Sequence, residues 1–183
     1  MKKHSPPDIL SKRVAASSQL FTIESLDLRF SNGEERTYER MKPSHRHAVM
    51  SVPVTDDGRL MLIREYAAGT ESYALGFPKG LIDLGEEPEQ AANRELAEEI
   101  GFSANQLLPL KKVILAPSYF SSEMTLFLAQ DLYPCEAVGD EPEPLEILHW
   151  PLKDWKSLLE LDEFNEARSI TALMMTVLHL NLT

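Results

Sequence analysis

The stretch GLIDLGEEPEQAANRELAEEIGF, residues 80 to 102, carries the strongest structural signal of the chain. Its second half predicts one helix over residues 87 to 100. At about 100° per residue, three apolar residues fall on one stripe of this helix: Ala92, Leu96 and Ile100. Pro88 suits the first helical turn, and Gly101 suits the end of the helix. Gly80 and Gly85 break the preceding segment into a loop. A glycine-bounded loop therefore leads into a helix of defined length.

Another face of this helix carries three glutamates at spacing i, i+3, i+4: Glu95, Glu98 and Glu99. Like charges at these spacings destabilise a helix, and an ion pair between Arg94 and Glu98 relieves only part of the repulsion. Mg²⁺ binds carboxylate oxygens and shares its coordination shell with substrate phosphates, so a magnesium site explains the cluster. A solvated acidic helix face is the alternative.

The same residues carry a family resemblance. Residues 80 to 102 fill every fixed position of the motif GX5EX7REUXEEXGU, in which U is apolar; we call this motif the box. Its positions are taken by Gly80, by Glu86 and by the run from Arg94 to Phe102. The chain thus resembles the Nudix hydrolases. That resemblance implies a metal-dependent hydrolase of nucleoside diphosphates linked to a group X. It also implies an α/β/α sandwich of the α/β (α+β) class, with a mixed sheet.

By this resemblance, Glu95 and Glu99 are the principal Mg²⁺ ligands, assisted by Glu98, with Mn²⁺ as a substitute ion. A backbone carbonyl near Lys79 is a further ligand, and Arg94 orients the glutamates. The acidic segment Gly139–Pro144, in which the prolines exclude a helix, occupies the place where related enzymes carry their general base. We therefore expect Glu141 to be the base and Glu143 a metal ligand. A solvated loop is the alternative.

The substrate expectations rest on segments outside the box. Pro117 and Tyr119 stand where enzymes of ADP-ribose and of diadenosine polyphosphates carry such residues, which makes ADP-ribose, diadenosine triphosphate and NADH the implied substrates. Gly76 and Ala67 depart from the ADP-ribose pattern, which usually has glutamate and arginine there. Tyr119 and Phe120 either stack on adenine or lie in the core. The expected substrate-binding residues are Glu24, Arg40, Arg46, Arg64, Leu81, Pro117, Ser118, Tyr119 and Glu123.

Composition narrows the class of protein. The chain has 183 residues, enough for one domain with a small appendage. Its net charge of −11 argues against nucleic acid or an anionic membrane as a partner, since both require positive surface. No signal peptide or apolar run long enough for a membrane span is expected. The single cysteine, Cys135, excludes an internal disulfide and fits the cytoplasm; a structural thiol explains it better than a nucleophile does.

Alternating apolar residues around Ser31-Asn32-Gly33 predict an antiparallel hairpin over residues 20 to 41, preceded by a loosely held lead-in. We expect residues 1–43 to form this appendage and residues 44–183 the hydrolase domain. Further strands are expected at 47–54, 60–63 (paired with 47–54 as a hairpin), 73–77, 107–115, 124–129 and 145–150. Helices are expected at 152–161 and 165–182. Strands and helices do not alternate regularly, which favours a mixed sheet between helices.

The resemblance further implies a homodimer, in which the hairpin crosses to the second subunit and helps to build its site. Two other functions fit the same residues. One is a Nudix enzyme of (d)NTPs or capped RNA, and the other is a non-catalytic domain that binds ADP-ribose. The intact trio of glutamates disfavours the second, and the negative charge disfavours long RNA.

Overall fold

The structure is a computed structural model that describes residues 5–43, 47–135, 137–139 and 141–182. The chain divides into two compact units. One comprises Met1–His45 with Ile114–Ser122, and the other comprises Arg46–Val113 with Glu123–Thr183. The strands β8 (Phe102–Ala116) and β9 (Phe120–Pro134) belong mainly to the second unit, but the turn that joins them belongs to the first.

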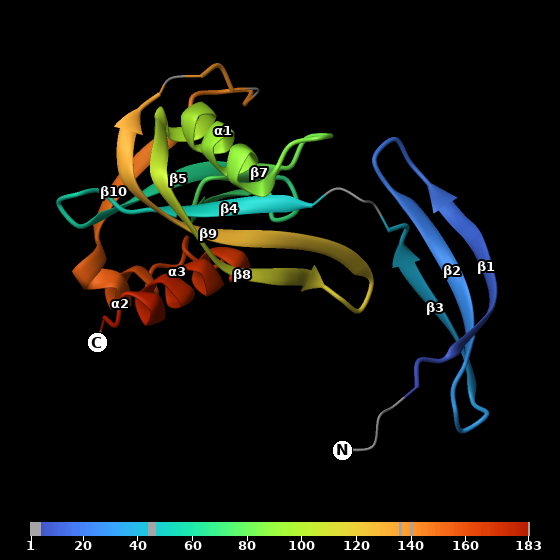
Figure 1. Ribbon diagram of the computed structural model, residues 1–183. Coiled ribbons are helices and arrows are strands. Elements are labelled where there is room, and N and C mark those ends of the chain that lie inside the picture. Colours follow the sequence, from blue (N-terminus) through green and yellow to red (C-terminus); the bar gives the residue numbers. More distant parts are fainter. Residues whose placement is uncertain (1–4, 44–46, 136, 140, 183) are drawn as a thin grey trace. The chain divides into compact units, whose positions relative to one another are not determined.

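The first unit is built on a three-stranded antiparallel sheet in the order β1-β2-β3 (Figure 1). The strands are β1 (Asp8–Ser17), β2 (Thr22–Arg29) and β3 (Glu35–Met41). The predicted Asn-Gly turn is confirmed: Gly33 adopts φ = 85°, and its N–H donates to the carbonyl of Phe30 at 2.9 Å. The turn between β8 and β9 joins this unit through a hydrogen bond from the Met41 N–H to the Tyr119 carbonyl, at 2.8 Å.

The expectation of a loosely held lead-in was wrong, because β1 pairs with β2 from Asp8 to Ser17. All ten residues of β1 are exposed, so its sequence carries no alternation between buried and exposed positions. The strand is held by backbone hydrogen bonds and by polar contacts to Asp27, which accepts from Ser11 Oγ at 2.5 Å and from Arg13 Nη1 at 2.9 Å. These contacts, with one from Thr37, lower the pKa of Asp27 to about 2.

The second unit contains two sheets and three α-helices among its described residues. A four-stranded mixed sheet has the order β7-β4-β9-β8, with β4 parallel to β9 and antiparallel to β7. A three-stranded antiparallel sheet has the order β10-β5-β6. The additional strands are β4 (Ala48–Pro53), β5 (Arg59–Ala67), β6 (Ser72–Gly76), β7 (Lys79–Leu81) and β10 (Glu146–Pro151). The predicted mixed α/β architecture is confirmed.

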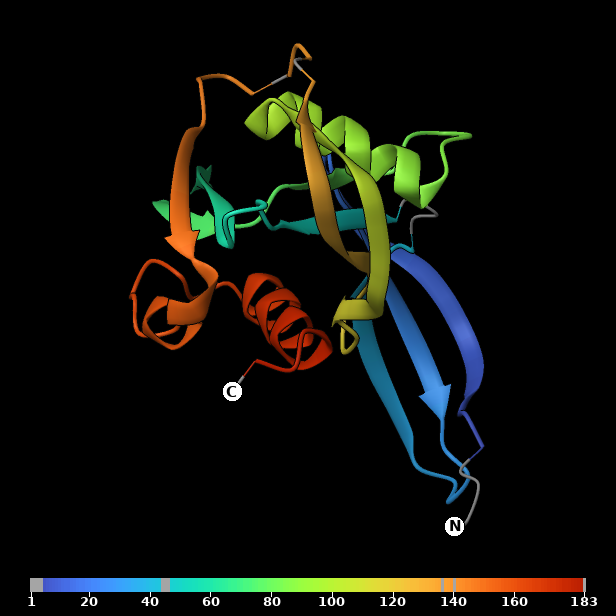
Figure 2. The same cartoon turned by 60° about the vertical axis from the view of Figure 1, so that its left-hand side comes forward.

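The helices α1 (Pro88–Ile100) and α3 (Ala167–His179) lie on opposite faces of the mixed sheet (Figures 1 and 2). The apolar stripe of α1 packs against both sheets: Leu96 and Ile100 share a buried cluster with Ile63 of β5 and Ala129 of β9. This burial fixes α1, and with it the acidic face that carries the box glutamates. No described helix has the length and apolar character needed to cross a membrane.

Several predicted elements have different bounds or partners in the structure. Strand β4 does not form a hairpin with β5; the two share one isolated bridge, Val54↔Leu60, and then enter different sheets. Every residue of β4 is buried, so β4 takes the central position between β7 and β9 instead. The segment 152–161 forms only a 3-10 turn (Leu152–Asp154) and the short α2 (Trp155–Leu158). Helix α3 begins two residues later than predicted, because Glu166 caps it by accepting from the N–H groups of Arg168 and Ser169.

Candidate active site

The acidic helix α1 begins and ends where its local sequence dictates. Glu87 and Gln90 form a reciprocal capping box, and Pro88 occupies the first turn. At the other end, Gly101 adopts φ = 72°, and its N–H donates to the Ala97 carbonyl at 3.2 Å. These caps set the register of the helix, which determines the direction in which each glutamate projects.

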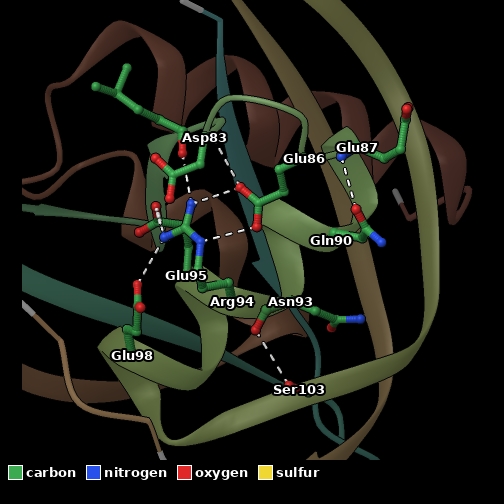
Figure 3. Close-up of polar contacts among 10 residues, drawn as sticks. Asp83, Glu86, Glu87, Gln90, Asn93, Arg94, Glu95, Glu98 and Ser103 are labelled. Carbon is green, nitrogen blue, oxygen red and sulfur yellow. Dashed lines mark hydrogen bonds and ion pairs between the residues drawn. The ribbon is translucent and has the colours of Figure 1, made fainter.

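Arg94 is the centre of the polar network on α1 (Figure 3). Its guanidinium donates to both carboxylate oxygens of Glu86, each at 3.1 Å. Nη1 donates to Glu95 Oε1 at 2.7 Å and, as the i, i+4 spacing predicts, to Glu98 Oε2 at 3.0 Å. Nη2 donates to the Leu81 carbonyl at 2.8 Å, so Leu81 takes part through its backbone. Its hydrogen bonds to the carboxylates of Glu86 and Glu95, Glu86 foremost, raise the pKa of Arg94. Arg94 therefore ties Glu86 of the loop to two of the three glutamates on the helix.

Glu99 is the most deeply buried of the three box glutamates, with 8% of the residue exposed. Its Oε2 accepts a hydrogen bond from the backbone N–H of Lys79 at 2.9 Å. Burial raises the pKa of Glu99 to about 8, and the nearby charge of Lys79 only partly offsets this effect. A buried carboxylate with such a raised pKa lacks a strong positive partner. A divalent cation is one species that would supply it.

Gly80 makes room for the carboxylate of Glu95. A Cβ added to Gly80 would lie 1.9 Å from Glu95 Oε1 and 2.0 Å from its Cδ, so any side chain there would displace the carboxylate. Glycine is thus required at position 80 because it lacks a side chain and lets the Glu95 carboxylate approach the backbone closely. Its conformational freedom is not the reason. Carboxylates packed this closely are the hard oxygen donors that Mg²⁺ prefers, and the donor set fits a divalent cation.

A polar hollow of about 430 Å³ lies over this face of α1. It is lined by residues from β7, the following loop, α1 and the acidic segment: Lys79, Gly80, Leu81, Asp83, Arg94, Glu95, Glu98, Val138 and Glu141. The structure therefore brings Glu141 to the same hollow as Glu95 and Glu98, although 42 residues separate it from Glu99. Among the residues that the structure describes, no three histidine, cysteine, aspartate or glutamate side chains already converge as a metal site. In the structure, the guanidinium of Arg94 is hydrogen-bonded to the carboxylates of Glu95 and Glu98.

Two of the expected metal ligands lie differently from the expectation. Glu143 is absent from the described lining of the hollow; its Oε1 accepts a hydrogen bond from the hydroxyl of Tyr73 at 2.5 Å. Lys79 lines the hollow, but its ammonium group pairs with Glu65. Lys79 and Glu65 also line a second cavity, between β5, β6 and the start of α3. The backbone of Lys79 contacts the helix through its N–H, which donates to Glu99. Binding of the metal by a backbone carbonyl near Lys79 stays a prediction.

The expected substrate residues are dispersed. Arg64 is held by Glu146 and by Glu163, whose Oε1 lies 2.9 Å from Arg64 Nη2, and it does not line the hollow among the described residues. Glu123 lies 3.6 Å from His47 Nδ1 and 3.7 Å from Lys112 Nζ. Arg46 lies outside the described residues. Arg64 of β5 therefore connects β10, through Glu146, with the segment that follows α2, through Glu163.

The remaining expected substrate residues belong to the unit of the N-terminal sheet. Glu24 is buried and accepts from Arg40 Nε and Nη2, each at 3.1 Å, so both side chains are engaged within that sheet. Pro117, Ser118 and Tyr119 form the exposed turn between β8 and β9. Tyr119 is 58% exposed, which excludes the alternative that its ring lies in the core and leaves it accessible for stacking.

Tyr73 and Glu65 contact two expected site residues and are not predicted from the sequence. Tyr73 lies in a predicted strand, and it contacts Glu143 across 70 positions of sequence. No local pattern reports such a contact. Tyr73 is 50% exposed on β6, and an exposed aromatic residue next to a site is a candidate for binding.

Comparison with known proteins agrees with this geometry. Residues 44–180 match the NUDIX domain, and residues 7–40 match the NudE-type Nudix hydrolase N-terminal domain. The chain therefore belongs to the Nudix hydrolase family, whose members generally use divalent metal ions.

The similarity to individual relatives extends over nearly the whole chain. It is 60% identical to the ADP compounds hydrolase NudE of Escherichia coli (strain K12), covering 92% of this chain and 90% of that protein. It is 30% identical to an ADP-ribose pyrophosphatase of Bacillus subtilis (strain 168), covering 90% and 91%. A crystal structure of an ADP compounds hydrolase superposes with a TM-score of 0.95 at 57% identity, covering 99% of this chain and 97% of that one. The sequence-based assignment to this family, and to its ADP-compound subgroup, is confirmed.

Proposed function

We propose that this chain is a Mg²⁺-dependent pyrophosphatase that cleaves ADP-linked compounds to AMP and the phosphorylated group X. The observation that carries the proposal is the hollow that Glu141 shares with Glu95 and Glu98 of a complete box. The names of its relatives, an ADP compounds hydrolase and an ADP-ribose pyrophosphatase, support ADP-ribose as a substrate. Diadenosine triphosphate and NADH are further members of the proposed class.

The proposed roles of the residues follow from their chemistry. Glu95, Glu98 and Glu99 hold the cation, for which Mn²⁺ would substitute. When bound, the cation neutralises the pyrophosphate and increases the acidity of water. Arg94 keeps Glu95 and Glu98 in place through the hydrogen bonds described above. Glu141 accepts the proton of the attacking water as the new P–O bond forms. The P–O bond of the anhydride then breaks, and one phosphate group remains on each product.

The proposal is tested by analysing products for ADP-ribose, diadenosine triphosphate, NADH and dNTPs, each with Mg²⁺ and with a chelator. We expect AMP together with ribose 5-phosphate from ADP-ribose, and no turnover with the chelator. Cleavage confined to dNTPs would support the triphosphate alternative. Binding of ADP-ribose without products would support a non-catalytic domain.

We further propose that residues 1–43 form a dimerisation element and that the protein acts as a homodimer. The three-stranded sheet and the connection between β1 and β2 expose several large apolar side chains, which are unfavourable in water: Ile9, Val14, Leu20, Phe21 and Tyr38. Pairing with a second copy would cover them. Light scattering at micromolar concentration should give twice the 20.7 kDa mass of the chain. Replacement of Val14 by glutamate should weaken the dimer, whereas a wild-type monomer at that concentration would contradict the proposal.

We propose that this activity is cytoplasmic. The single Cys135 is partly buried and forms no disulfide, as is usual in a reducing compartment. Recovery of the activity mainly from a periplasmic or membrane fraction of the cell would contradict this placement.

A further inference from the structure

The segment that carries Glu141 has an unusually restricted backbone. Glu141 and Glu143 each precede a proline, Pro142 and Pro144. A residue before proline is confined to extended conformations, and proline fixes its own φ near −65°. Few backbone rotations therefore remain between Glu141 and Glu143. Any contact that holds Glu143 also limits where the carboxylate of Glu141 lies.

Described contacts hold the segment on each side of Glu141. Before it, Gly139 packs against the last turns of α1, since a Cβ added there would lie 3.4 Å from the Glu98 carbonyl oxygen. After it, Glu146 opens β10 and pairs with Arg64 of the neighbouring strand β5. The contact nearest to Glu141 on this side is the one between Glu143 Oε1 and the hydroxyl of Tyr73, at 2.5 Å.

Tyr73 is placed to reach the segment by the order β10-β5-β6 of the antiparallel sheet. Its cross-strand partner is Tyr66 of β5, and the two rings meet edge to face with centroids 5.6 Å apart. This packing limits the rotation of the Tyr73 ring. The hydrogen bond to Glu143 raises the pKa of Tyr73, so the hydroxyl stays protonated and remains a donor at neutral pH.

We propose that Tyr73 is a positioning residue for the hydrolysis: by holding Glu143, it sets the carboxylate of Glu141 in the hollow. The inference rests on the proposed function, specifically on Glu141 as the base. It assigns Glu143 a structural task in place of metal binding. Because small displacements of a catalytic group slow proton transfer strongly, a single surface hydrogen bond has a measurable effect on the rate.

The test is a double-mutant cycle of Tyr73→Phe and Glu141→Gln, with ADP-ribose and saturating Mg²⁺. Glu141→Gln alone reports whether the base assignment holds, and should lower kcat by about 100-fold or more. Tyr73→Phe alone should lower kcat by about 10-fold, with KM changed by less than about 2-fold. In the Glu141→Gln background, Tyr73→Phe should have less than about a 2-fold effect, because no base remains to be positioned.

The outcomes are separable. If Glu141→Gln slows turnover but Tyr73→Phe does not, or if the two losses multiply, the positioning role is wrong and the proposed function stands. If Glu141→Gln keeps wild-type turnover, the base assignment is wrong, and the positioning role falls with it. Losses that multiply, meaning that Tyr73→Phe has the same effect in both backgrounds, would indicate a structural role for Tyr73 that is independent of Glu141.

Tyr66→Phe is the matched control, since it removes a hydroxyl from the other ring of the pair and leaves the hydrogen bond to Glu143 in place. It should keep kcat within about 2-fold of wild type. The Mg²⁺ dependence provides a second readout. Tyr73→Phe should leave the Mg²⁺ concentration for half-maximal activity unchanged, whereas a large increase would mean that Glu143 binds the metal and that the inference is wrong.

Discussion

Replacement of Glu99 by glutamine should lower kcat by about 1,000-fold while leaving the fold intact, because a neutral amide is a much weaker ligand for a hard divalent cation. The amide oxygen of glutamine can still accept the hydrogen bond from the Lys79 N–H that Glu99 accepts at 2.9 Å. The side chains have nearly the same volume, so no cavity is created in this buried position. Steady-state kinetics with ADP-ribose and Mg²⁺ provides the measurement.

The same variant should be more stable than wild type when metal is removed at high pH. Burial raises the pKa of Glu99 from 4.5 to about 8, so between these values the folded protein binds a proton that the unfolded chain has lost. The contribution of Glu99 to the stability of the metal-free protein is therefore full below pH 4.5 and is lost as the pH rises through 8. Glutamine does not titrate and keeps its contribution.

Thermal unfolding in chelator at pH 5 and pH 9 measures this difference. The stability of the variant relative to wild type should increase from the lower pH to the higher. Glu89→Gln, an exposed change in the first turn of the same helix, is the control: it should leave activity unchanged and should shift the stability by the same small amount at both pH values. Wild-type turnover in Glu99→Gln would show that the box of this chain does not bind the catalytic cation through Glu99.

Replacement of Glu141 by glutamine should lower kcat by a factor of about 100 to 10,000, the usual contribution of a positioned general base. Glu141 lines the hollow beside Glu95 and Glu98, and it lies on a segment outside both sheets, so the substitution should leave the packing unchanged. The Mg²⁺ dependence should stay close to wild type, because the three box glutamates remain.

A pH–rate profile separates this role from metal binding. In wild type, kcat should fall on the acidic side as the base becomes protonated, and this fall should be reduced in Glu141→Gln. Glu160→Gln, an exposed change elsewhere in the chain, is the control. A variant that regains full turnover at higher Mg²⁺ concentration would identify Glu141 as a metal ligand and contradict its assignment as the base.

The parts of this structure that could be predicted are those encoded within a few residues. The length of α1 follows from Pro88 and Gly101, and the pairing of Arg94 with Glu98 follows from the helical repeat. The turn at Gly33 follows from the need of a two-strand connection for positive φ. Each of these depends on contacts that neighbours in sequence can make.

The features that could not be predicted depend on partners far away in the sequence. Strand β1 is exposed on both faces and exists because β2 offers it hydrogen bonds, so its own residues give no periodic signal. Strand β4 pairs with β9, which lies about 70 residues later in the sequence, and so it does not form a hairpin with β5. The ion pairs of Arg64 with Glu146 and Glu163 likewise depend on how the sheets assemble. The same holds for the hydrogen bond between Tyr73 and Glu143.

The turn between β8 and β9 limits how enzymes of this kind can be recombined. Ile114–Ser122 is grouped with the N-terminal sheet, where the Met41 N–H donates to the Tyr119 carbonyl, although its flanking strands lie in the hydrolase unit. A hybrid made by exchanging residues 1–43 alone would join the sheet of one parent to the turn of the other. The N-terminal segment and the turn between β8 and β9 have to be exchanged together. The N-terminal unit is therefore encoded by two separate stretches of the gene.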